Sequence, residues 1–149
     1  MEIRFATKYD AKNISELVTS LSHYYLGQKQ KELPDWFLST MEENEFKNRI
    51  KSDEYINLIS IEQNELIGYI SMNTNGHLYH LFVSEKHQGQ GIARQLWNKT
   101  TQKYNLSKYT VRSSINAVPV YTAFGFSVTA QEGEKDGIHF QPMELVTRR

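Results

Sequence analysis

The segment His77–Gln95 reads His-Leu-Tyr-His-Leu-Phe-Val-Ser-Glu-Lys-His-Gln-Gly-Gln-Gly-Ile-Ala-Arg-Gln. It begins with strand-forming residues, His77–Val83, continues through a polar turn to Gly89 and Gly91, and ends in an apolar pattern of helical spacing from Ile92. The first turn of a helix leaves about four backbone N–H groups unpaired and carries roughly half a positive charge, so it attracts anions. The segment therefore predicts a strand, a glycine loop and a helix N-terminus that together bind a phosphate group.

Three kinds of phosphate-binding loop compete for this segment, and residue spacing separates them. A P-loop requires Lys-Ser/Thr after its last glycine, and none follows here. A dinucleotide loop requires a third Gly or Ala where Arg94 stands. The pattern that fits is Gln/Arg-x-x-Gly-x-Gly/Ala, supplied by Gln88, Gly91 and Ala93. It resembles the coenzyme A pyrophosphate loop of the GNAT superfamily of N-acetyltransferases.

A second motif of that family follows downstream, in the segment Tyr121-Thr122-Ala123-Phe124-Gly125-Phe126. The resemblance implies that Tyr121 protonates the leaving thiolate, although a core tyrosine would give the same pattern. Many family members carry an Asn seven residues before this Tyr. Here Ser114 holds that place and Asn116 lies nearby, so either residue is a candidate for contact with the cofactor.

The order of expected elements is that of an α+β protein with one mixed, mostly antiparallel sheet flanked by about four helices, in a single domain over residues 1–149. The resemblance implies the GNAT fold, with a splayed central strand pair at 77–83 and 109–113. The expected elements are a strand at 3–5, a helix capped by Asp10, a helix from Pro34 to about Ser52, strands at 55–61, 66–72 and 77–83, a helix from Ile92 to about Tyr104, a strand at 109–113, a short helix at 119–125, and strands at 126–130 and 138–145 around a loop at 133–137.

The candidate general base is His77, because imidazole titrates near neutral pH and the family commonly places its base about here. A packed or solvent-facing histidine is the alternative. Strand alternation puts Tyr79 on the face of His77 and His80 on the other face. A backbone N–H near Val83 would bind the oxyanion, on the resemblance alone. The cofactor-binding residues that the resemblance implies are Leu81, Phe82, Val83, Gln88, Gly89, Gln90, Gly91, Ile92, Ala93, Arg94, Ser114, Asn116 and Tyr121.

Composition excludes several other classes of protein. The chain has 149 residues, with 17 basic residues balanced by 17 acidic ones, so no net charge favours nucleic acid. It lacks cysteine, and its five histidines show no metal-ligand spacing, so no metal is expected. No apolar run approaches about eighteen residues and the start of the chain is strand-like, which predicts a cytoplasmic protein without a membrane partner. The oligomeric state is left open, a homodimer included.

The predicted function is transfer of an acetyl group from acetyl-CoA to a primary amine, directly in a ternary complex. The alternative is a catalytically inactive module of the same fold that binds coenzyme A. The acceptor and the length of the acyl chain are left open, and the regions expected to select the acceptor are 22–45 and 131–137. Five acidic residues in or near the first region would either attract a cationic amine or be a solvated surface: Glu32, Asp35, Glu42, Glu43 and Glu45.

Overall fold

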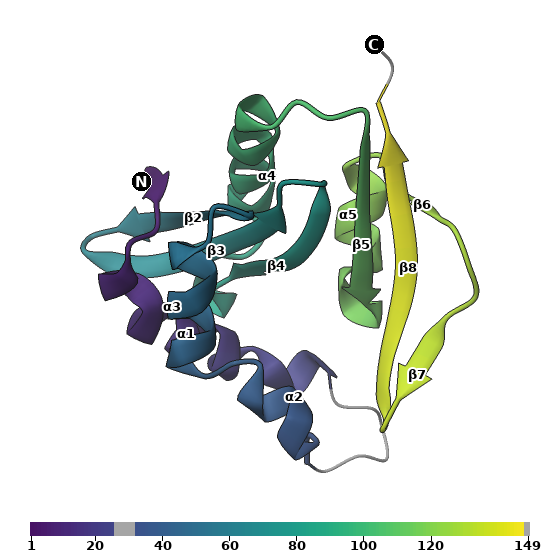
Figure 1. Ribbon diagram of the computed structural model, residues 1–149, viewed down its shortest axis with the longest axis horizontal. Coiled ribbons are helices and arrows are strands. Elements are labelled where there is room, and N and C mark those ends of the chain that lie inside the picture. The colour runs from purple at the N-terminus through teal and green to yellow at the C-terminus, as the bar shows by residue number, and fades with distance from the viewer. Residues whose placement is uncertain (26–31, 148–149) are drawn as a thin grey trace.

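The computed structural model describes residues 1–25 and 32–147 of the chain (Figure 1). The strands are β1 (Glu2–Phe5), β2 (Tyr55–Glu62), β3 (Glu65–Asn73), β4 (His77–Val83), β5 (Lys108–Ser114), β6 (Ser127–Val128), β7 (Gly133–Lys135) and β8 (Ile138–Val146). The α-helices are α1 (Ala11–Ser20), α2 (Asp35–Ser39), α3 (Glu43–Lys51), α4 (Ile92–Lys103) and α5 (Val118–Ala123). Within this described part, no helix has both the length and the apolar composition that a bilayer crossing requires.

The strands form one mixed sheet in the order β1-β2-β3-β4-β5-β8-β6, and β7 pairs with β8. Every pairing is antiparallel except that of β4 with β5. The predicted hairpin turn at Gln63 and Asn64 is confirmed, and both residues have positive φ, at 51° and 65°. Two left-handed residues match the right-handed twist of the flanking strands. The α+β architecture and the mostly antiparallel sheet are as predicted.

The sheet opens between β4 and β5. These two strands pair only where β4 begins and near the middle of β5, with His77 opposite Thr110 and Leu78 opposite Val111. Beyond that point they diverge. Figure 1 shows strands β1 to β4 and the neighbouring strands β5 and β8 as two parts of the sheet that point in different directions. The predicted splayed pair is therefore confirmed, and the opening lies toward the carboxyl ends of both strands.

A β-bulge interrupts β4 near its start. Ser71 of β3 pairs with His80, and the next residue of β3, Met72, pairs with Leu78. Tyr79 is therefore the extra residue on β4. A bulge leaves the inserted residue out of the regular ladder and re-aims the side chains around it, and bulges are common beside active sites.

The bulge corrects the sequence prediction for the faces of β4. The rings of His77 and Tyr79 are 4.8 Å apart, as expected for neighbours on one face. The guanidinium of Arg49 in α3 lies 5.5 Å from the Tyr79 ring, and the ring of His80 lies 5.5 Å from that of Phe46, also in α3. Tyr79 and His80 thus face the same side. The prediction that His80 faces away was wrong because the inserted residue breaks the two-residue period.

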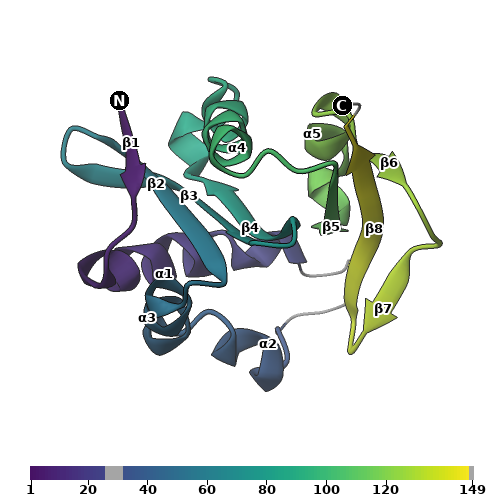
Figure 2. The ribbon, with the colours of Figure 1, turned by 45° about the horizontal axis from the view of Figure 1, so that its top comes forward.

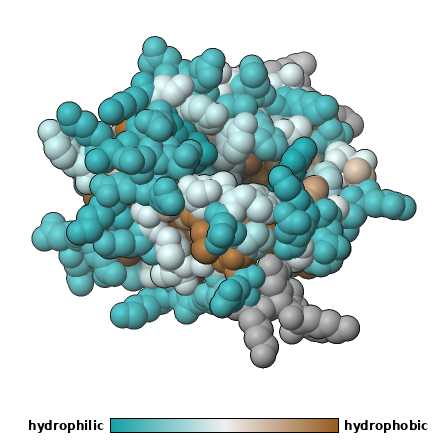
Figure 3. All heavy atoms as spheres, turned by 60° about the horizontal axis from the view of Figure 1, so that its bottom comes forward, coloured by the Kyte–Doolittle hydropathy of each residue, from teal (hydrophilic) through white to brown (hydrophobic). Residues whose placement is uncertain are grey.

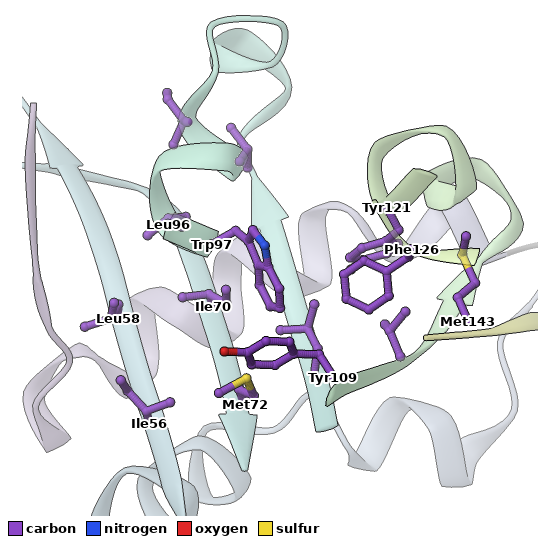
Figure 4. Close-up of a cluster of buried hydrophobic side chains, with 14 of the residues drawn as sticks. Ile56, Leu58, Ile70, Met72, Leu96, Trp97, Tyr109, Tyr121, Phe126 and Met143 are labelled. Atoms are coloured by element: carbon purple, nitrogen blue, oxygen red, sulfur yellow. The ribbon is translucent and has the colours of Figure 1, made fainter. Parts of the chain in front are cut away.

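Helices cover both faces of the sheet (Figure 2). Helix α4 packs on β2, β3 and β4 and α5 packs on β5 on one face, while α1 and α3 cover the other. On the α4 face, Trp97 packs edge-on against Tyr109 of β5 at 5.0 Å and lies 5.5 Å from Phe126, and Figure 4 shows these rings with Tyr121 in one cluster. Because the cluster joins α4, β5 and α5, it fixes the position of strands β5 and β8 relative to strands β1 to β4.

The region between α1 and β2 departs from the prediction. The single helix expected from Pro34 to Ser52 is two helices, since Glu42 has extended backbone angles and α3 begins after it. Met41, next to this break, is 4% exposed and packs in the α1–α3 core. Burial of one apolar side chain thus takes precedence over helical continuity.

Two local predictions near the ends also need correction. Asp10 does not cap α1 through its side chain, because its carboxylate accepts hydrogen bonds from Arg4 at 2.9 Å and from the N–H of Thr7 at 2.7 Å. The strand expected at 126–130 is only Ser127–Val128, and the loop expected at 133–137 contains β7.

Candidate active site

A cavity of about 520 Å³ occupies the opening between the splayed strands. Its walls come from the ends of β4 and β5, the glycine loop, the start of α4, the helix α5 and the turn at Ser22–Tyr25. This volume lies within the range that suits a small-molecule ligand. The predicted site residues that line the cavity are Leu81, Phe82, Val83, Gln88, Gly89, Gly91, Ile92, Ala93, Arg94, Ser114, Asn116 and Tyr121. Two predicted residues, Gln90 and His77, do not line it.

The glycine loop presents its backbone to the cavity. Gly89 and Gly91 have φ of 78° and 81°, which L-residues with side chains rarely adopt, and a Cβ at either position would meet no atom within 4 Å. Gly91 is the N-cap of α4, and the first hydrogen bond of the helix runs from the N–H of Gln95 to the carbonyl of Gly91, at 3.1 Å. The backbone N–H groups at the start of α4 therefore point out of the helix toward open space, as anion binding requires.

Two side chains fix this loop in place. Gln88 donates from Nε2 to the carbonyl of Val83 at 3.0 Å, which ties the loop to the end of β4. Arg94 donates from Nη2 to the carbonyl of Ala123 at 2.9 Å, and its guanidinium lies 5.0 Å from the Phe124 ring. The loop is therefore anchored to both walls of the cavity before any ligand arrives.

Tyr121 belongs to α5 and lines the cavity. It is 6% exposed, and its ring packs edge-on against Phe124 and Phe126 at 6.1 and 5.6 Å. Burial raises the pKa of its phenol, and the neighbouring Tyr25 adds to the effect. Burial also raises the pKa of Tyr25 to about 12. Both phenols are thus protonated at neutral pH, and each is able to donate a proton or a hydrogen bond into the cavity.

His77 lies at the closed end of the strand pair. Its Nδ1 shares a hydrogen bond with Oγ1 of Thr110 at 2.7 Å, and its ring touches that of Tyr79, which does line the cavity. Burial lowers the pKa of His77, and the positive charge of Arg112 lowers it further. The imidazole is therefore neutral at pH 7, and it contacts Tyr79, which lines the cavity, without lining the cavity itself.

A model of one protein family matches residues 25–147, and its description is "Acetyltransferase (GNAT) domain". The chain belongs to the GNAT acetyltransferase family. A comparison of this GNAT sequence with curated proteins gives no match. The cavity, the glycine loop and Tyr121 thus lie in a GNAT domain, which is the family that the sequence motifs indicate.

Solved structures share the fold of this GNAT chain. A PaiA N-acetyltransferase from Thermoplasma acidophilum in complex with coenzyme A superposes with a TM-score of 0.73 at 18% identity, covering 98% of each chain. An aminoglycoside 6'-N-acetyltransferase complexed with coenzyme A gives 0.73 at 13% identity, covering 100% of this chain and 99% of that one. A ribosomal-protein-alanine N-acetyltransferase from Brucella melitensis gives 0.72 at 17% identity, covering 99% and 100%. At these identities the likeness establishes the GNAT fold.

Several lining residues escaped the sequence analysis of this GNAT chain. Leu21, Tyr24 and Tyr25 reach the cavity from the end of α1, and Arg112 reaches it from β5. Asn116 donates to the carbonyl of Tyr24 at 3.0 Å, which joins the turn after α1 to the segment after β5. The pair Tyr24-Tyr25 after an amphipathic helix was the available signal. Arg112 gave no signal, because an arginine on a strand is more often solvated.

The five acidic residues near α2 and α3 do not reach the cavity. Glu32, Asp35, Glu42, Glu43 and Glu45 are exposed, and none belongs to the lining. Among the described residues, no group of three His, Asp or Glu side chains is placed to hold a metal ion.

Proposed function

We propose that this chain transfers an acetyl group from acetyl-CoA to a primary amine, directly in a ternary complex. The observation that carries the proposal is that one cavity, between splayed strands, is lined both by the open N-terminus of α4 and by the buried Tyr121. We further propose that residues 1–149 form one acetyltransferase domain, since one sheet runs from β1 to β8.

The cofactor would bind along the wall formed by residues 81–83 and 88–94, which we name the cofactor wall. Its pyrophosphate would accept hydrogen bonds from the N–H groups at the start of α4, beside the open space at Gly89 and Gly91. Its extended arm would lie against the end of β4, where the splay leaves the strand edge without a partner from β5. Between the two candidates left open by the sequence, Ser114 is the freer to contact the cofactor, because the Asn116 amide already donates to Tyr24.

The chemical step joins the acceptor nitrogen to the thioester carbonyl carbon and breaks the carbon–sulfur bond. The electron pair of that bond leaves with the sulfur, and the Tyr121 hydroxyl supplies a proton to the thiolate. The phenol suits this role because burial raises its pKa and keeps it protonated. Holding both reactants in one cavity provides the orientation that the direct transfer needs. A buried, cavity-facing acid favours an enzyme over an inactive binding module.

The acceptor nitrogen also has to lose a proton. His77 is neutral at pH 7 and thus able to accept one, but it does not line the cavity, whereas Tyr79, whose ring it contacts, does. We propose that the proton reaches His77 indirectly, through the Tyr79 hydroxyl or a water molecule. His77 is then a proton acceptor at the end of a short relay.

Thermal denaturation with coenzyme A and acetyl-CoA, together with a thiol-release assay on a panel of amines, tests the proposal. A ligand that binds only the folded chain at a thousand times its Kd stabilises it by about 4 kcal/mol, which raises Tm on the order of 10 °C. Adenosine, which lacks the pyrophosphate, should give little shift. Absence of a shift with either coenzyme would contradict the cofactor site. A shift without thiol release on any amine would favour the inactive module.

A further inference from the structure

We propose that the acceptor carries an anionic group, a carboxylate or a phosphate, beside its amine, and that Arg112 binds this group. The proposal rests on the acetyl transfer proposed above and specifies the chemical class of its acceptor. The evidence for it is the set of charged side chains around the cavity, not the fold.

The cavity is lined mainly by apolar and aromatic side chains, and its charged lining residues are cationic. Among its described residues there is no carboxylate, although two arginines, Arg94 and Arg112, belong to it. Arg94 is held at the start of α4 by its bond to the Ala123 carbonyl, on the cofactor wall. Arg112 lies on the other side of the splay, so it is available to a second ligand.

Arg112 is placed to meet an anion. Its side chain is exposed, its guanidinium lies 5.4 Å from the Phe140 ring, and no carboxylate of the described residues forms an ion pair with it. A guanidinium that rests on a ring keeps its N–H groups free for a planar carboxylate or a phosphate. Lys108 lies on the same strand and the same face of the sheet, but it differs from Arg112 because its Nζ forms an ion pair with Glu144 at 3.1 Å.

A second guanidinium strengthens the positive potential on this side. Arg49 lies behind the lining residue Tyr79, at 5.5 Å from its ring, and its Nη1 is buried without a hydrogen-bond partner. A cationic acceptor such as a polyamine would therefore enter a region of like charge, and an anionic one would be attracted. Figure 3 shows the side of the molecule that lies at the bottom of Figure 1; it is mainly hydrophilic, with a small hydrophobic area near its middle.

Acceptors matched in all but charge test the proposal with acetyl-CoA in the thiol-release assay. The first set pairs each of the common amino acids and β-alanine with its amide, and the second pairs phosphoethanolamine with ethanolamine. We expect kcat/KM to be about 10- to 100-fold higher for the anionic member of at least one pair, the size of a charged hydrogen bond. The set that shows the preference identifies carboxylate or phosphate.

Variants then assign the preference to one residue. Arg112→Gln should abolish the preference by raising KM for the anionic member, so that the ratio of kcat/KM between the two members of a pair falls to about one, and Arg112→Lys should keep part of the preference. Lys108→Gln, which removes a cation of the same strand outside the cavity, should leave it intact. Preferential use of a neutral or cationic amine by the wild type would overturn the proposal while leaving acetyl transfer standing. A preference that survives in Arg112→Gln would also overturn it.

Discussion

The two sides of the cavity differ in how the chain builds them. The cofactor wall comes from two ranges that are close in the sequence, 81–83 and 88–94, and it includes the start of α4 and the open space at two glycines. The opposite side, which we name the acceptor wall, is formed by Tyr24, Tyr25, Tyr79 and Arg112, and it presents side chains from three separate segments. Backbone groups suit a constant ligand, whereas side chains are free to change with the acceptor.

The largest expected effect is that of Tyr121→Phe, which removes the proposed acid. We expect kcat to fall by roughly 10²- to 10³-fold while the affinity for acetyl-CoA stays near that of the wild type, since the ring still packs on Phe124 and Phe126. Single-turnover acetylation and a thermal shift with acetyl-CoA measure the two quantities. The matched control is Tyr9→Phe, because Tyr9 is 82% exposed and outside the cavity.

The pH dependence of the wild type sharpens this prediction. Because the pKa of Tyr121 is raised above its usual value near 10, the phenol stays protonated throughout the neutral range. We therefore expect no loss of kcat on the basic side below about pH 10. A wild-type rate in Tyr121→Phe would assign the hydroxyl to the core instead of the reaction.

The second largest expected effect is the loss of coenzyme A binding in Gly91→Val, a change in the cofactor wall. Gly91→Val introduces a Cβ into the open space beside the start of α4 and strains a backbone with φ of 81°. We expect the thermal shift with coenzyme A to be lost or much reduced, and the unliganded protein to lose about 1–3 kcal/mol of stability. Differential scanning calorimetry with and without the ligand separates the two effects.

Gly137 provides the control for backbone strain. It has φ of 85° in the turn between β7 and β8 and does not line the cavity. Gly137→Val should therefore lower stability by a similar amount and keep the shift with coenzyme A. If both variants lose the shift, the effect of Gly91→Val is general destabilisation and the cofactor site lies elsewhere.

The contrast between the walls also explains what the sequence was able to predict. The strand, the glycine loop and the helix start of 77–95 are encoded by neighbouring residues, so local periodicity and the two glycines were sufficient. The hairpin at Gln63 and Asn64 was predictable for the same reason. The family resemblance then supplied the splay of β4 from β5, which no local pattern indicates.

The acceptor wall depends on contacts between distant segments. Tyr25, in the turn after α1, and Arg112, on β5, line one cavity, and nothing near either residue in the sequence indicates this. The break between α2 and α3 follows from the burial of Met41 in a core with α1. The bulge at Tyr79 is set by the pairing of β4 with β3, so strand alternation gave the wrong face for His80. Such tertiary effects override local propensity.

The smallest expected effect is that of His77, which supports the acceptor wall from behind Tyr79. A base in direct contact with the amine would make His77→Gln roughly 10²- to 10⁴-fold slower. Because His77 does not line the cavity, we expect a loss of kcat/KM of about tenfold or less. The substitution removes only the last proton acceptor of the relay, and a water molecule is able to take its place. Steady-state kinetics with the best acceptor of the panel measures this loss.

The pH profile distinguishes a relay from mere packing. Burial and the charge of Arg112 lower the pKa of His77, so the imidazole is neutral above pH 6.5 and becomes charged only below it. If His77 accepts the proton, kcat/KM is flat above about pH 6.5 and falls on the acidic side, and His77→Gln removes that fall. Arg112→Gln should move the fall to higher pH, because it removes the charge that lowers the pKa. An unchanged acidic limb in His77→Gln would leave His77 a packing residue, held at Thr110 and Tyr79, and would assign deprotonation to water or to the acceptor itself.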